Sequence, residues 1–181
     1  MILDNPKLRI VVIGYLQNKE LVGETWSQTD SMKTLKYFLV YSVNNKEIVH
    51  QLDLIGALWQ AKVKNRVFVK LESRYTDYFP GYSIYFGRAL RSLKSVYGMN
   101  NSGKLFTADS TEWLLEAGLI QSQCQMSIYY KYALDEKKML LLSYVDDCLY
   151  WYTSEVLGNW FLYALGKRFH VKFLRYAHWF I

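Results

Sequence analysis

The clearest pattern of apolar and polar positions lies between residues 139 and 153, where two apolar, aromatic-rich runs flank the adjacent acids Asp146 and Asp147. Strand-forming residues on both sides of a two-residue polar break predict a tight β-hairpin with the acids at its tip. Two neighbouring carboxylates repel each other, and a divalent cation that binds several oxygens would stabilise them. Asp is also a common turn residue, so an acidic turn without a metal is the alternative.

Three other segments have apolar residues at helical spacing and predict helices. The first covers 31–43 and has Asp30 or Ser31 as its N-cap. The second starts at Ser102 or Thr107, runs through 111–117 and stops at Gly118. The third covers 155–168. The apolar positions expected to face the core are Met32, Leu35, Leu39 and Val43 in the first, Trp113, Leu114 and Ala117 in the second, and Val156, Trp160, Tyr163 and Leu165 in the third.

Short apolar or β-branched runs predict strands at 7–17 (ending near Gly14), 48–54, 67–71, 127–134 and 170–174. Between them we expect loops at 18–30 and at the basic stretch 62–66. An irregular connection is expected at 73–86, and 88–94 is a basic cluster. The order of elements predicts an α+β fold, an antiparallel sheet with helices packed on one face.

Asp53 ends the otherwise apolar strand at 48–54, and a carboxylate there is costly unless it is paired or ligates a metal. An Asp that caps the following turn is the alternative. If this strand and the hairpin are neighbours in one sheet, Asp53, Asp146 and Asp147 converge on a pair of divalent ions. Such a pair serves phosphoryl transfer, which needs mainly positioning and charge neutralisation.

Composition narrows the class of protein. The 181 residues suit one domain, or one with an inserted lobe, and 51% hydrophobic with 21% charged residues indicate a folded chain. A net charge of +6 suits a polyanionic partner, nucleic acid first. Cys124 and Cys148 show no zinc or disulfide pattern, so an intracellular location is expected. No run of 18 apolar residues predicts a membrane span.

Other motifs are weaker. The stretch 98–104, GMNNSGK, nearly matches a phosphate-binding loop, but Leu105 stands where a Ser or Thr would ligate magnesium. The same residues suit a turn and a helix start. His50, His170 and His178 have no metal-ligand spacing, and no G-x-S-x-G elbow of a serine hydrolase occurs.

With these residues in place, the chain resembles the reverse transcriptase domain of copia-type LTR retrotransposons. Residues 144–147 resemble the family's YVDD box, and 50–61, HQLDLIGALWQA, resemble its first catalytic motif. Residues 7–17 resemble a fingers strand, 93–106 the segment that supports template and nucleotide, and 177–181 the closing hairpin region. These five segments occur in the family's order.

The resemblance implies a right-hand polymerase fold with fingers at 1–30 and 63–93 and palm at 31–62 and 94–181, and with the thumb absent. It implies that Asp53, Asp146 and Asp147 hold two Mg²⁺ or Mn²⁺ ions and that the backbone near Leu54 faces the triphosphate. Lys7 and Arg9 would contact nucleotide phosphates. Residues 97–104, including Asn101, would line the template and nucleotide pocket.

Four positions depart from the pattern expected of this family. Ile13 stands where a second arginine is expected, Gln28 where a proline is expected, and Asn101 where a glutamine is expected. Leu58 replaces a bulky aromatic residue that would exclude a ribose 2′-hydroxyl, so weaker discrimination between sugars is expected.

The implied function is an RNA-directed DNA polymerase that binds an RNA or DNA template-primer and a dNTP. The alternative is a truncated retroelement remnant that acts as a structural or binding subunit of a larger assembly. The 16 Tyr and 6 Trp residues fit either alternative, because aromatic surfaces favour protein contacts and also stack on unpaired bases.

Overall fold

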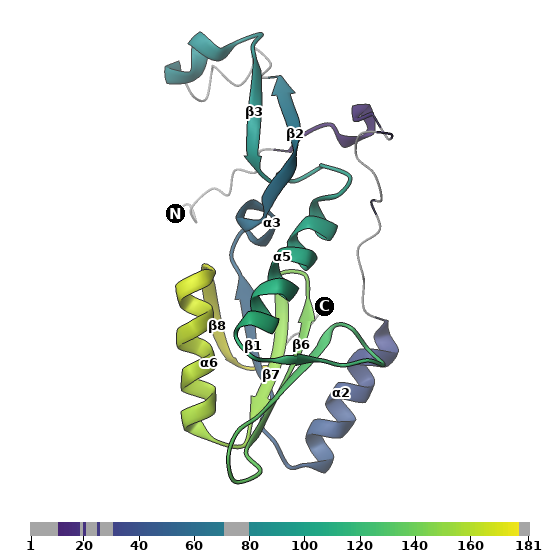
Figure 1. Cartoon of the computed structure of the whole chain (residues 1–181), viewed down its shortest axis with the longest axis vertical. Helices are drawn as coiled ribbons and strands as arrows, with labels where there is room; N and C mark the ends of the chain where they lie inside the picture. The colour runs from purple at the N-terminus through teal and green to yellow at the C-terminus, as the bar shows by residue number, and fades with distance from the viewer. Residues whose placement is uncertain (1–10, 19, 21–24, 26–30, 71–79, 178–181) are drawn as a thin grey trace, which may run out of the picture.

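The computed structural model describes residues 11–18, 20, 25, 31–70 and 80–177. Its centre is a six-stranded sheet in the order β4-β5-β6-β7-β1-β8, with every neighbouring pair antiparallel (Figure 1). Its strands are β4 (Ile120–Gln121), β5 (Ile128–Tyr132), β6 (Lys138–Tyr144), β7 (Asp147–Tyr152), β1 (His50–Leu54) and β8 (Val171–Tyr176). The predicted antiparallel α+β fold is confirmed.

A second, two-stranded sheet pairs β2 (Lys62–Lys70) with β3 (Ala89–Lys94) and projects from the six-stranded sheet (Figure 1). It follows the short helix α3 (Ala57–Gln60). The predicted loop at 62–66 is therefore wrong, and the strand at 89–94 was not predicted. Both stretches are basic and lack an apolar run, and their pairing with each other makes them strands. The expected irregular stretch contains the 3-10 helix η2 (Pro80–Tyr85).

Helices cover both faces of the six-stranded sheet, which corrects the expectation of helices on one face. Met139, Leu141, Cys148 and Tyr150 pack with residues of α5 (Ser102–Glu116) and α6 (Glu155–Arg168). Leu142, Leu149 and Trp151 pack instead with Leu35 and Phe38 of α2 (Met32–Asn44). Because side chains alternate along a strand, one sheet can supply two apolar cores. Both hairpin strands are apolar at successive positions, as strands buried on both faces are.

The helix α2 begins where the sequence predicts, and the Ser31 hydroxyl caps it by accepting from the Thr34 N–H. Of its four predicted core positions, only Leu35 is buried. Leu35 and Phe38 are buried, whereas Met32 and Val43 are 56% and 72% exposed. This helix carries apolar residues on all sides, so periodicity alone does not select the face that packs.

The other two helices also begin close to their predicted starts, at Ser102 and Glu155. In α6 the buried apolar residues are Leu157, Phe161 and Leu165. Of the four predicted core positions only Leu165 is buried, and Val156 is 81% exposed. In α5, Leu114 is buried as predicted.

The described part of the predicted strand at 7–17, residues 11–17, is not a regular strand. The first residues of the predicted strand lie outside the described part of the chain. Val11 forms a single parallel bridge with Tyr97, and the 3-10 helix η1 (Gly14–Leu16) follows. None of the helices in the described ranges is long and apolar enough to cross a membrane.

Candidate metal and nucleotide site

The loop between β6 and β7 consists of Val145 and Asp146, because Tyr144 pairs directly with Asp147. Asp147 is therefore the first residue of β7, and only one of the two acids lies at the tip, which corrects the prediction. Val145 has a φ of 52°, a left-handed conformation that is strained for a β-branched residue. The positive φ at the first loop residue alone is the pattern of a type II′ hairpin turn.

Asp53 lies directly opposite Asp147 in the antiparallel pair of β1 and β7. The next residue, Leu54, donates its backbone N–H to the carbonyl of Asp146 at 2.7 Å. The hairpin loop is therefore tied to the end of β1. The sequence analysis expected the acids to converge if their strands were neighbours, and β1 and β7 are neighbours.

All three acidic residues are half-buried. Burial makes the largest contribution to raising the pKa of Asp147, and the negative charges of Asp146 and Asp53 raise it further. A hydrogen bond with the Gln51 side chain acts in the opposite direction. The site thus brings three negative charges together at the paired ends of β1 and β7.

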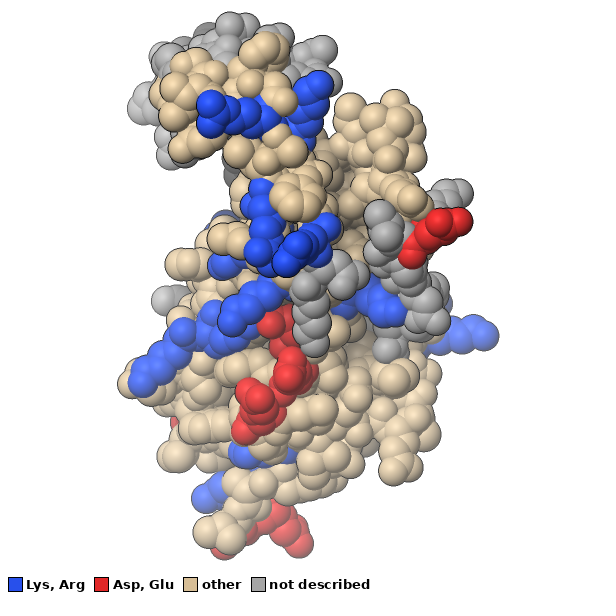
Figure 2. All heavy atoms as spheres, turned by 45° about the horizontal axis from the view of Figure 1, so that its top comes forward, with Lys and Arg blue, Asp and Glu red and all other residues tan. Residues whose placement is uncertain are grey.

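A divalent cation suits this set of oxygen donors, because carboxylates are the ligands that Mg²⁺ and Mn²⁺ prefer. Within the described ranges, no three His, Cys, Asp or Glu side chains already form a group that could hold a metal ion. Figure 2 shows acidic side chains gathered in the middle of one face, with Lys and Arg side chains above and beside them. That face presents both signs of charge close together.

The structure describes three of the five predicted nucleotide-binding residues. Leu54 is buried, and its N–H is already engaged by Asp146. Leu58, on α3, packs against the core beneath α5 and α6. Asn101 is 9% exposed and stands at the N-cap of α5, where its carbonyl accepts from the Leu105 N–H. Lys7 and Arg9 lie outside the described residues.

The stretch 98–104 has a structural role that the sequence did not predict. The Asn100 side chain donates to the carbonyl of Gly14, and its backbone N–H donates to the Gln17 side chain, both at 2.8 Å. The Val12 N–H donates to the Tyr97 carbonyl. Segment 11–17 is thereby fixed against the start of α5. A signal for this contact lay in the two glycines, Gly14 and Gly98, since close backbone approach requires residues without a Cβ.

The sequence analysis also did not predict a role for Gln51 in the site. It lies two residues before Asp53 on the same face of β1, and its side chain reaches Asp147. A buried polar residue within an apolar strand is a signal for such a partner.

Comparison with protein families gives a match that spans almost the whole chain. A family model described as reverse transcriptase (RNA-dependent DNA polymerase) covers residues 4–181. No solved structure matches the chain.

Proposed function

Because the chain belongs to the reverse transcriptase (RNA-dependent DNA polymerase) family, we propose that it extends a nucleic-acid primer on a template, using dNTPs. The observation that carries this proposal is the placement of Asp53 opposite Asp147, with Asp146 tied to the same strand end. Three carboxylates on two paired strand ends suit the charge-dominated chemistry of nucleotidyl transfer.

Within the family, the copia type is supported by the sequence of residues 144–147 and by the order of the other four segments. We assign residues 1–30 and 63–93 to the fingers and 31–62 and 94–181 to the palm. Except for its end residues Lys62 and Lys94, the projecting β2–β3 sheet falls in the second fingers range, and all strands of the six-stranded sheet fall in the palm ranges.

The proposed roles of the acids follow from their positions. Asp53, Asp146 and Asp147 hold two divalent ions, Mg²⁺ or Mn²⁺, through carboxylate oxygens. When bound, these ions would lower the pKa of the attacking primer hydroxyl and neutralise the charge of the triphosphate. The bond from the Leu54 N–H to the Asp146 carbonyl keeps the hairpin loop in register with β1. Gln51 orients the Asp147 carboxylate through their hydrogen bond.

The nucleotide-binding roles remain proposals from the sequence. Lys7 and Arg9 would contact the phosphates of the incoming nucleotide. Leu58 would leave room near the sugar, and Asn101 would support the template and nucleotide pocket. Backbone near Leu54 would face the triphosphate, although the N–H of Leu54 itself is used within the protein.

Single-turnover primer extension with Mg²⁺ tests this function. The wild-type chain should extend a primer on RNA and DNA templates, and Asp53→Asn should reduce the rate at least about 100-fold, as loss of a charged group that stabilises the transition state does. Asp109→Asn is a matched control, because Asp109 pairs with Arg168 and not with the site. Extension that survives the double change Asp146→Asn and Asp147→Asn would refute the proposal.

A binding or structural role is a second candidate, favoured by the outer face of α2. Met32, Val40 and Val43 are 56%, 59% and 72% exposed there. Contiguous exposed apolar side chains are typical of protein contact sites. Purification from the native source separates the two cases. A stoichiometric protein partner without nucleic acid favours the subunit role, and salt-sensitive template binding favours the polymerase.

A further inference from the structure

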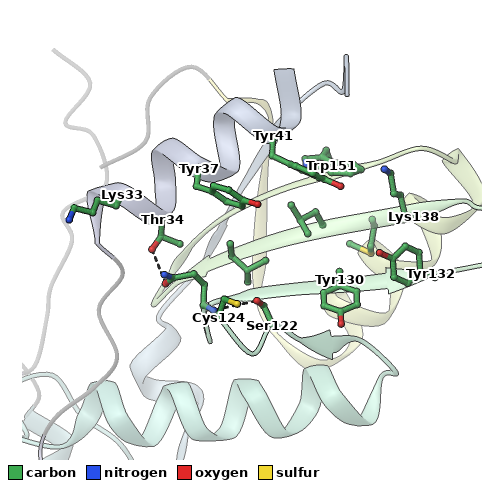
Figure 3. Close-up of a pocket in the computed structure, with 14 residues that line it drawn as sticks. Lys33, Thr34, Tyr37, Tyr41, Ser122, Cys124, Tyr130, Tyr132, Lys138 and Trp151 are labelled. Carbon is green, nitrogen blue, oxygen red and sulfur yellow. Dashed lines mark hydrogen bonds between the residues drawn. The ribbon is translucent and has the colours of Figure 1, made fainter. Parts of the chain in front are cut away.

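A groove of about 630 Å³ lies between α2 and strands β5, β6 and β7 (Figure 3). This volume is in the range of small-molecule sites. Its walls include Tyr37 and Tyr41 from α2, Tyr130 and Tyr132 from β5, and Trp151 from β7. The close-up shows these rings on both sides of the open space, with Lys33 near one end and Lys138 near the other.

The aromatic wall is ordered as a stack. The rings of Tyr37 and Tyr41 are 6.4 Å apart between centroids and 16° from parallel. Tyr41 in turn stacks on Trp151 at 6.0 Å. Tyr37 is 66% exposed, so the outer end of the stack is accessible. A further flat ring can extend this stack from the open side.

The polar groups of the groove select for an anion or a hydrogen-bond acceptor. The Lys138 ammonium lies 5.7 Å from the centroid of the Trp151 ring and donates to the Asn45 side chain. Among the described residues that line the groove, Lys33 and Lys138 are charged and none is acidic. The indole N–H of Trp151, a residue only 1% exposed, has no hydrogen-bond partner among the described residues.

We propose that this groove binds an unpaired nucleotide, with the base stacked on the tyrosines and the phosphate near the lysines. Stacking rings beside cations, without acids, are the means by which proteins hold unpaired bases independently of sequence. An acidic peptide would satisfy the lysines but would leave the outer ring of the stack without a flat partner. The nucleotide can be free or part of a single strand, and both present the same chemistry.

The groove is separate from the three acids but shares a face of the sheet with them. Trp151 and Asp147 are four residues apart on β7 and therefore point to the same side. At ~3.3 Å per residue, they are roughly 13 Å apart along the strand. The proposal goes beyond primer extension, because binding in the groove requires none of the acids.

Protection of Cys124 from alkylation gives a local readout on the native chain. Cys124 lines the groove and is exposed, whereas Cys148 is buried and burial raises its pKa to about 12. A short oligodeoxythymidylate should slow the reaction of Cys124 with iodoacetamide, and an abasic strand of equal length should not. Competition by free dTMP would identify the free nucleotide as ligand, and protection by the strand alone would identify single-stranded nucleic acid.

Two pairs of variants test the contacts. Tyr37→Leu should weaken protection at least about fivefold, the low end for loss of one base–ring stack, while Tyr37→Phe keeps the ring and should retain binding. Lys138→Gln should weaken protection, whereas the neighbouring Lys137→Gln should not, because Lys137 lies outside the groove. Thermal melting confirms that each variant is folded.

The proposal is overturned if the abasic strand protects Cys124 equally, if an acidic peptide protects it and oligodeoxythymidylate does not, or if both lysine variants behave alike. In the Asp147→Asn variant, oligodeoxythymidylate should protect Cys124 as fully as in the wild type. Loss of primer extension and loss of nucleotide binding in the groove are therefore observed separately.

Discussion

Asp53 and Asp147 lie directly opposite each other on the paired strands β1 and β7, with Asp146 next in the chain. Directly opposed like charges destabilise a sheet, so placing these two carboxylates together in the folded state has a cost that a bound cation would remove. The same pairing therefore governs both the stability of the protein and its proposed chemistry.

Asp147→Asn should stabilise the metal-free protein at neutral pH. The folded-state pKa of Asp147 is raised above 3.8, so the folded state holds this proton more tightly than the unfolded state does. Wild-type stability should therefore fall as pH rises from about 3.8 through the raised value, and the variant should lack this contribution. Urea unfolding of both proteins, measured on each side of that window, gives the comparison. An advantage of the variant that is the same on both sides would contradict the explanation.

Val145→Gly should be more stable than Val145→Ala by about 1 kcal/mol, because only glycine adopts a positive φ without strain. Both variants lose the contacts that Val145 makes with the core, so their difference isolates the backbone conformation. Chemical denaturation measures it. The reverse order, which is usual in regular helices and strands, would show that the hairpin turn is not strained.

Gly98→Ala should destabilise the chain by about 2 kcal/mol or more, or release segment 11–17. A Cβ at residue 98 would lie 2.1 Å from the carbonyl oxygen of Val12, and the φ there is 88°. Gly166→Ala is the matched control, because its Cβ would meet nothing within 4 Å. In the helix α6 it should stabilise by roughly 0.5 to 1 kcal/mol. Equal effects of the two changes would contradict the described contact.

One thiol should react rapidly in the native protein and the other only on unfolding. Cys124 is exposed, whereas Cys148 is buried between the sheet and its helices, and this burial raises its pKa to about 12. Ellman titration before and after addition of denaturant counts the accessible thiols. Rapid reaction of both thiols in the folded chain would show that β7 is open.

The elements of this fold could largely be predicted from the sequence, because the hairpin, the three helices and β1 have strong local patterns. The helix faces that pack against the sheet could not be predicted in this way. α2 and α6 are apolar around much of their circumference, so tertiary contacts decide that Phe38 and Phe161 are buried and that Val43 and Val156 are exposed. The first half of β2, residues 62–66, and the strand β3 are basic, have no apolar run and depend on their pairing with each other.

For the candidate site, the sequence proposed the three acids, on the condition that their strands are neighbours, and it placed both hairpin acids in the turn. The register of β6 and β7 moves Asp147 into the strand opposite Asp53. That register follows from the strained turn at Val145, which no apolar pattern reveals. The contact between Gln51 and Asp147 is equally invisible until the strands are paired.

Binding of Mn²⁺ tests the central claim most directly, since it reads the carboxylates themselves. Titration followed by electron paramagnetic resonance, with dTTP present and no primer, should show two bound ions in the wild-type chain. Asp53→Asn and Asp147→Asn should each lose at least one of them, while Asp109→Asn should bind as the wild type does. Equal binding by all four proteins would show that the acids at the ends of β1 and β7 are not a metal site.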